Sequence, residues 1–230
     1  MTNQILPLFP TVIYQCKLDG FEEWRDLLLS KKEYQFDPND GDPHLTGEFR
    51  DKCLMHKDED LMSFFAEVTD GIYGCLEAAG VKKDMHIPYI MKSWFTIKDK
   101  SDMLGEHRHA CSDLSFVYYL TGGQLCFKQE WNANQYFGGM LDPKPPERSH
   151  IENETFFTTK VAATTVAPGD LLVFPSNLLH FVMPEEGTDT VVRSVAGDIK
   201  LMLTDEYTNL ETGLIHYSHW RKFNTKGLHK

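Results

Sequence analysis

Two histidines in the stretch "GEHRHACSDLSFVYYL" (residues 105–120) have the type and spacing of a metal-binding pair. His107 and His109 lie two residues apart, just before a run of aromatic and β-branched residues. In a β-strand, side chains at positions i and i+2 point to the same face. The pair is therefore a candidate for binding one metal ion, although two such histidines also occur at ordinary surface positions.

A third histidine and an arginine extend this candidate site. His180 follows the run "VAPGDLLVFPSNLL", and Arg193 comes thirteen residues later in "TVVRSVAGDI". Two neighbouring ligands and one remote ligand can occupy one face of an octahedral ion and leave about three positions open. Catalysis needs such open positions, whereas a structural metal does not. A guanidinium in an otherwise apolar strand needs an anion, and its two parallel hydrogen bonds suit a dicarboxylate.

The segments around these residues have the pattern of many short strands. Runs such as "YIMKSWFTIK", "SFVYYL", "GQLCFK" and "DLLVFP" are rich in β-branched and aromatic residues and are separated by turn signals such as "TGG" and "PGD". This spacing predicts a β-sandwich or barrel with helices packed outside. Ahead of it, Leu8–Leu18 has the composition of a strand, and apolar residues at helical spacing predict a helix over Asp58–Ala79.

We expect these elements to form one domain over residues 1–230. An N-terminal strand and flanking helices occupy 1–88, the β core occupies 89–204, and a C-terminal tail occupies 205–230. The long irregular segment 129–153, with its aromatic residues Trp131, Tyr136 and Phe137, is a candidate lid over a substrate.

Composition narrows the class of protein. The formal charge of −11 disfavours a general nucleic-acid binder. The five cysteines form no CxxC pair, so neither a disulfide framework nor a zinc ribbon is expected. Neither a signal peptide nor an apolar run of about 20 residues is present. We therefore expect a cytoplasmic protein that acts on a small-molecule or peptide substrate without a membrane, with a homodimer as one expected assembly.

Several motifs, taken in order, resemble those of the iron(II)- and 2-oxoglutarate-dependent oxygenases, in particular the prolyl-hydroxylase-like branch and its small phage or bacterial members. The family pattern is a His-x-Asp/Glu pair, a "YYL"-like strand, a "G-D-x-L-x-F-x-S" strand that ends near a distal histidine, and an arginine. The matching pieces here are "HRH", "SFVYYL", "GDLLVFPSNLLH", "VVRSVAGD" and an early "LFPT". The resemblance covers roughly residues 90–200. It implies a mostly β fold with flanking helices, the double-stranded β-helix (jelly roll, cupin-like).

The resemblance also implies roles for single residues. His107 and His180 match the two iron-binding histidines, and Arg193 matches the arginine that binds the distal carboxylate of 2-oxoglutarate. Tyr119 matches a tyrosine that hydrogen-bonds the same carboxylate in prolyl hydroxylases. Tyr119 shares its strand face with Ser115. The alternative interpretation of this tyrosine is ordinary packing in the core.

One position departs from the family pattern, because His109 stands where the family has a carboxylate. If His109 is a ligand, the metal is held by three imidazoles, and we favour this reading because similar small family members also carry H-x-H here. Alternatively, Glu106 or Asp113 supplies the carboxylate and His109 only supports the site.

The function implied is an iron(II)- and 2-oxoglutarate-dependent dioxygenase that hydroxylates an organic substrate, such as a prolyl or other amino-acid residue, and converts 2-oxoglutarate to succinate. Two alternatives stay open. A three-histidine cupin dioxygenase would not use 2-oxoglutarate, and Arg193 would then bind a carboxylate of the substrate itself. A non-catalytic jelly-roll binding module would need no open metal site.

Overall fold

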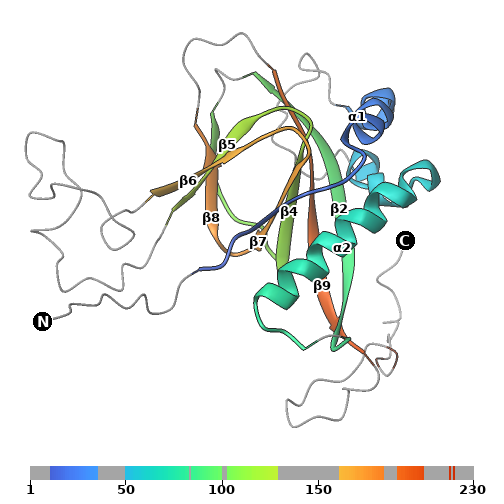
Figure 1. Ribbon diagram of the computed structural model, residues 1–230, viewed down its shortest axis with the longest axis vertical. Helices are drawn as coiled ribbons and strands as arrows, with labels where there is room; N and C mark the ends of the chain where they lie inside the picture. The colour runs from blue at the N-terminus through green and yellow to red at the C-terminus, as the bar shows by residue number, and fades with distance from the viewer. Residues whose placement is uncertain are drawn as a thin grey trace, which may run out of the picture.

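The computed structural model describes residues 11–35, 50–82, 84–99, 103–128, 161–183, 191–204, 218 and 220. Two antiparallel sheets face each other, and helices lie against the outside of one of them (Figure 1). The larger sheet has the strand order β1-β7-β4-β9-β2, and the smaller has the order β3-β8-β5-β6. The strands are β1 (Tyr14–Lys17), β2 (His86–Asp99), β3 (Leu104–His107), β4 (Leu114–Tyr119), β5 (Gly123–Lys128), β6 (Val161–Val166), β7 (Asp170–Pro175), β8 (Leu179–Val182) and β9 (Val191–Leu203). The helices are α1 (Phe21–Ser30), α2 (Met62–Ala78) and the short 3₁₀ turns η1 (Lys32–Tyr34), η2 (Arg50–Cys53), η3 (Met55–Lys57) and η4 (Glu59–Leu61).

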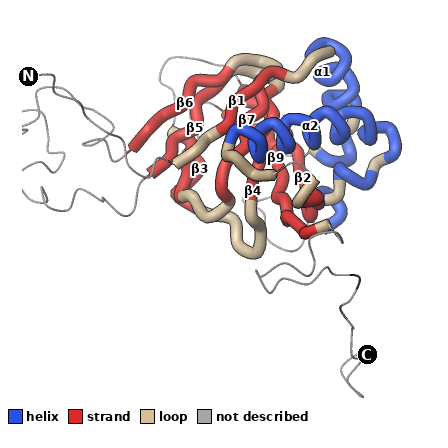
Figure 2. Tube along the Cα trace, turned by 60° about the horizontal axis from the view of Figure 1, so that its bottom comes forward, coloured by secondary structure: helices blue, strands red, loops and turns tan. Residues whose placement is uncertain are grey.

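The outer face of the larger sheet packs against α1 and α2 (Figure 2). Helix α2 approaches strand β7 so closely that a Cβ atom on Gly71 would lie 2.5 Å from Leu171 Cδ2. Each fully buried apolar side chain contributes about 1.5–3 kcal/mol of transfer free energy, so this layer dominates stability. The outer core includes Leu28, Phe64, Phe65, Val68, Ile72, Phe95, Phe116, Tyr118, Val195 and Ile199.

The inner face of the larger sheet packs against the smaller sheet. The second core cluster draws residues from both sheets, namely Tyr119, Leu125, Phe127, Val166, Leu172 and Phe174. Alternate residues of one strand therefore enter different cores: Phe116 and Tyr118 of β4 face the helices, whereas Tyr119 faces the other sheet.

The architecture confirms the predicted mostly β jelly roll with flanking helices. The predicted helix Asp58–Ala79 is present as η4 followed by α2, and Asp58 caps its start by accepting a hydrogen bond from the Asp60 backbone N–H at 3.0 Å. The expected first strand is shorter, since β1 covers Tyr14–Lys17. None of the described helices has the length and apolarity that crossing a membrane would require.

Other expectations stay predictions. The division into parts 1–88, 89–204 and 205–230 is one of them. The proposed lid at 129–153 and the start of the "LFPT" motif lie outside the described residues.

Candidate metal centre

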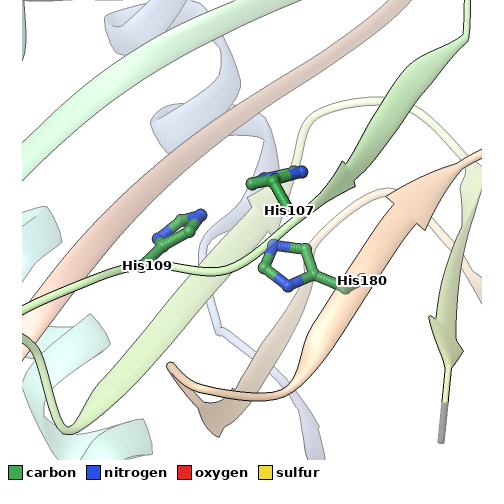
Figure 3. Close-up of side chains that lie close together, drawn as sticks. All are labelled: His107, His109 and His180. Carbon is green, nitrogen blue, oxygen red and sulfur yellow. The ribbon is translucent and has the colours of Figure 1, made fainter. Parts of the chain in front are cut away.

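The structure brings His107, His109 and His180 together. One ligand atom from each residue lies within 4.8 Å of those of the other two. The ring centroids are 4.2 Å apart for His107 and His180, 5.0 Å for His109 and His180, and 5.3 Å for His107 and His109. Figure 3 shows the three rings gathered between two strands and the loop that follows one of them. This is the separation at which three imidazoles can bind one ion.

Strand register explains how the remote histidine arrives at the site. His107 is the last residue of β3, and its Cα pairs with that of His180 in the antiparallel β3–β8 ladder. Side chains on directly paired residues lie on the same face of a sheet. Two histidines far apart in the sequence thus become neighbours through one strand pairing.

His109 reaches the site by a different route from the one expected. It lies two residues beyond the end of β3, so strand alternation does not align it with His107. Its backbone N–H instead donates to the Ser176 carbonyl oxygen at 3.0 Å. The Ser176 N–H donates in turn to the Asp113 carbonyl oxygen at 3.1 Å. These bonds tie the loop after β3 to the end of β7 and hold His109 beside the other two rings.

Hydrogen bonds at Nδ1 orient all three rings. Nδ1 of His107 lies 2.8 Å from the Gly105 carbonyl oxygen, and Nδ1 of His180 lies 2.8 Å from the Leu178 carbonyl oxygen. Nδ1 of His109 contacts a carboxylate oxygen of Asp198. Because a carbonyl or carboxylate oxygen only accepts, Nδ1 is the donor in each of these contacts, and Nε2 is the atom of each ring that would bind a metal. Three imidazoles that converge in this way are a donor set that suits iron, zinc, copper or nickel.

Burial keeps His180 neutral. The residue is 3% exposed, and burial lowers the pKa of His180 from the ordinary 6.5 to about 4. The Leu178 carbonyl acts in the opposite direction, and the nearby His107 and His109 reinforce the lowering. At neutral pH the Nε2 atom of His180 is therefore available to a metal without first losing a proton.

A buried polar network lies behind His109. Asp198 on β9 is fully buried, and its Oδ1 accepts hydrogen bonds from the His109 ring and from the Ser115 hydroxyl, the latter at 2.9 Å. Its Oδ2 pairs with Lys92 Nζ at 2.9 Å. Burial acts to raise the pKa of Asp198, but His109 and then Lys92 lower it below the ordinary 3.8. Asp198 is therefore a carboxylate anion at neutral pH.

Aromatic rings form the sides of the site. The Trp94 ring centroid lies 5.6 Å from that of His109, and Lys92 Nζ lies 4.9 Å from the Trp94 ring centroid. Phe174 contacts His180 edge-on with centroids 4.9 Å apart. Apolar walls of this kind restrict water around a bound ion and strengthen electrostatic interactions within the site.

The two carboxylates considered as alternative ligands lie elsewhere. Glu106 pairs with Lys128 Nζ at 2.6 Å, and Asp113 pairs with Lys200 Nζ at 2.9 Å. Among the residues that the structure describes, no carboxylate belongs to the group of convergent ligand atoms.

The two residues predicted to hold 2-oxoglutarate lie on different faces of the larger sheet. Tyr119 is buried in the inner core, and burial raises its pKa above the ordinary 10, so it is a neutral phenol. Arg193 is half-buried, and its Cα pairs with that of Ile97. Strand alternation places Arg193 with Val195 on the face toward the helices, opposite Asp198. The roles of both residues therefore stay predictions.

Asp198, Lys92 and Trp94 were not singled out from the sequence. Asp198 is the last residue of the quoted motif "VVRSVAGD", and it faces the site because it pairs with Ser115 of β4 and Lys92 of β2. The available signal was the single acidic residue in a largely apolar strand, because a carboxylate needs partners when it is buried.

Comparisons with known proteins agree with this geometry. Residues 92–196 match the family model described as "Putative 2OG-Fe(II) oxygenase". That span contains all three histidines, Tyr119 and Arg193, and it ends two residues before Asp198. A search of curated proteins gives no match.

Solved structures with this fold include the non-heme monooxygenase ThoJ in a nickel complex (TM-score 0.51, 13% identity, 83% of this chain and 74% of that chain). The alpha-ketoglutarate-dependent carbocyclase SnoK from nogalamycin biosynthesis is similar as well (TM-score 0.50, 12% identity, 84% and 82%). An oxidoreductase of the 2OG-Fe(II) oxygenase family from Burkholderia pseudomallei matches with a TM-score of 0.40 and 14% identity over 62% of this chain. This chain spans 57% of that protein. At these identities the likeness shows the fold alone.

The resemblance to the iron(II)- and 2-oxoglutarate-dependent oxygenases predicted from the sequence is confirmed by the family match over residues 92–196.

Proposed function

We propose that this protein is an iron(II)- and 2-oxoglutarate-dependent dioxygenase in which His107, His109 and His180 hold the metal. The observation that carries the proposal is the convergence of three imidazoles, each of which has an acceptor oxygen at its Nδ1 atom. Three ligands on one ion leave open positions for a cosubstrate and O₂. The family match over the same residues supports iron and 2-oxoglutarate as the occupants.

When bound, iron and 2-oxoglutarate supply the oxidising chemistry, with 2-oxoglutarate converted to succinate and CO₂ as the substrate is hydroxylated. The residues of this chain position the metal ligands. The β3–β8 pairing fixes two imidazoles relative to each other, and the hydrogen bond to Ser176 fixes the loop that carries the third. Trp94 and Phe174 exclude water from two sides.

We also propose a substrate class, a place of action and the residues that bind 2-oxoglutarate. The substrate is an organic molecule or peptide, with a prolyl or other amino-acid residue as the first class to test, and the protein acts in the cytoplasm as a monomer or homodimer. Arg193 and Tyr119, which lie on opposite faces of the larger sheet, are proposed as alternative partners of the far carboxylate of 2-oxoglutarate. Loss of a hydrogen bond to a charged group costs about 1.5–3 kcal/mol, so Arg193→Met should raise the KM for 2-oxoglutarate by about 10- to 100-fold. If the KM is unchanged, the residue that binds this carboxylate lies on the inner face instead, and Tyr119→Phe tests that alternative.

One observation favours a second candidate function. A set of three imidazoles without a carboxylate also fits a dioxygenase that uses no 2-oxoglutarate. In that case the open positions would bind the substrate directly, and O₂ uptake would proceed without release of succinate.

Anaerobic titration with Fe(II) and 2-oxoglutarate tests the proposal. We expect the weak visible charge-transfer band of the chelate, followed by succinate release when O₂ is admitted with a substrate. His180→Ala should remove the band. The matched control His56→Gln, which changes a histidine bonded to Ser93 outside the cluster, should keep it. Fe(II) binding without the band supports the second candidate, and no Fe(II) binding contradicts both.

A further inference from the structure

We propose that Asp198 is a positioning residue for His109 and that its carboxylate acts on the metal through the His109 ring, where the family pattern has a carboxylate bound directly. The inference rests on the proposed function, since it requires His109 to be a metal ligand. It goes further by assigning a role to a residue on another strand, outside the matched span 92–196.

The register of the sheet brings three residues side by side. The Cα atom of Asp198 on β9 pairs with Ser115 on β4 and with Lys92 on β2. All three side chains therefore lie on the same face. Oδ1 accepts a hydrogen bond from the Ser115 hydroxyl at 2.9 Å, and Oδ2 forms an ion pair with Lys92 Nζ at 2.9 Å. The carboxylate is thus held in place independently of His109.

The contact between Asp198 and His109 has two consequences. It fixes the plane of the ring and keeps the proton on Nδ1, so that Nε2 faces His107 and His180. A carboxylate that accepts from an imidazole also makes the opposite nitrogen more basic, which strengthens its bond to a metal. At Nδ1, the other two rings contact neutral carbonyl oxygens. His109 is therefore the ring whose Nδ1 atom has a charged partner, and it stands at the position of the family's carboxylate.

The alternative interpretation is that the ion pair of Asp198 and Lys92 only joins β9 to β2. The two interpretations differ in what happens when His109 is absent. A positioning residue acts on the metal through His109, so its effect on metal affinity disappears with that ring. A purely structural pair changes metal affinity by the same factor whether or not the ring is present.

A double-mutant cycle on Co(II) affinity separates these interpretations. Titration of the full-length protein with Co(II) alone, followed by its visible absorption, gives the dissociation constant and the ligand geometry. We expect Asp198→Asn to weaken Co(II) binding about 10- to 100-fold, the usual effect of removing such a partner. In the His109→Ala background, Asp198→Asn should cause little further loss.

Two further variants serve as a control for the loss of a carboxylate and as a replacement if Asp198→Asn does not fold. Asp58→Asn is the matched control, because Asp58 is also a carboxylate paired with a lysine but lies before η4, outside the histidine cluster. It should leave the Co(II) constant and spectrum unchanged. If Asp198→Asn fails to fold, Ser115→Ala removes a hydrogen bond to Asp198 and keeps the carboxylate, and a smaller loss of affinity with an altered Co(II) spectrum is expected.

The outcomes are distinct. If the unaltered protein does not bind Co(II), the proposed metal site itself is wrong. If it binds Co(II) and Asp198→Asn binds equally well, or if the loss is the same without His109, only the role of Asp198 is overturned.

Discussion

The two faces of the larger sheet carry different chemistry on the same strands. On β4, Phe116 and Tyr118 enter the outer core, whereas the neighbouring Ser115 hydrogen-bonds Asp198. On β9, Val195 and Ile199 pack under the helices, whereas Asp198 contacts the His109 ring. Because side chains alternate along a strand, one backbone serves both layers.

The difference shows how the fold tolerates a polar site inside it. Removing a carboxylate from water costs several kcal/mol even when it is paired, so apolar burial elsewhere has to offset the inner network. The outer core with its helices provides that stability, and it rigidly holds the strands that carry the site. Substitutions on the outer face should therefore change stability, and those on the inner face should change metal binding.

The largest expected effect on stability is that of Phe116→Ala. Phe116 is fully buried between the sheet and the helices, and removing a buried aromatic ring costs about 3–5 kcal/mol. Urea unfolding followed by circular dichroism gives the free energy of unfolding. The adjacent Ser115→Ala removes a hydrogen bond to a charged group and should cost less, about 1.5–3 kcal/mol. Equal losses at the two neighbours would contradict the division between the faces.

Gly197→Ala tests the same division beside Asp198. A Cβ atom there would lie 2.4 Å from Phe116 Cε1 and 2.8 Å from the Lys92 carbonyl oxygen. Overpacking of this kind costs about 1–3 kcal/mol. The control is Gly105→Ala, where nothing lies within 4 Å of the added atom and the change in unfolding free energy should stay within about 0.5 kcal/mol. A tolerated Gly197→Ala would mean that the outer face is loosely packed.

The smallest expected effect is a pH dependence from His56, a histidine outside the cluster. Its Nδ1 lies 2.9 Å from Ser93 Oγ, and burial, with a smaller contribution from Lys57, lowers its pKa below the ordinary 6.5. The unfolded chain therefore takes up a proton more readily than the folded one. The contribution of His56 to stability is complete above pH 6.5 and is lost as the pH falls through its lower folded pKa.

His56→Gln should accordingly show a shallower loss of unfolding free energy between about pH 7.5 and about pH 5 than the unaltered protein. The difference between the two curves isolates His56 from the other histidines. A steeper loss in the variant would show that the folded state holds this proton better, and it would reverse the sign.

Local pattern was enough to predict part of this molecule. The helical spacing of apolar residues identified α2, and turn signals between apolar runs identified most of the strands. The three histidines were also predicted, because a close pair and a distant histidine after a strand are visible in the sequence.

What depends on register was not predictable. Asp198 and His109 are far apart in the sequence and meet only because β9 pairs with β4 and the loop after β3 is tied to β7. The position of Arg193 shows the same limit. A shift of one residue in register moves a side chain to the opposite face, and the sequence alone does not determine that parity.

X-ray absorption at the iron edge of the anaerobic Fe(II)-loaded protein tests the central claim most directly, because imidazole ligands give a distinct scattering pattern that can be counted. We predict three imidazoles in the unaltered protein and two in each of His107→Ala, His109→Ala and His180→Ala. Two imidazoles in the unaltered protein, or an unchanged count in His109→Ala, would contradict a three-histidine iron site.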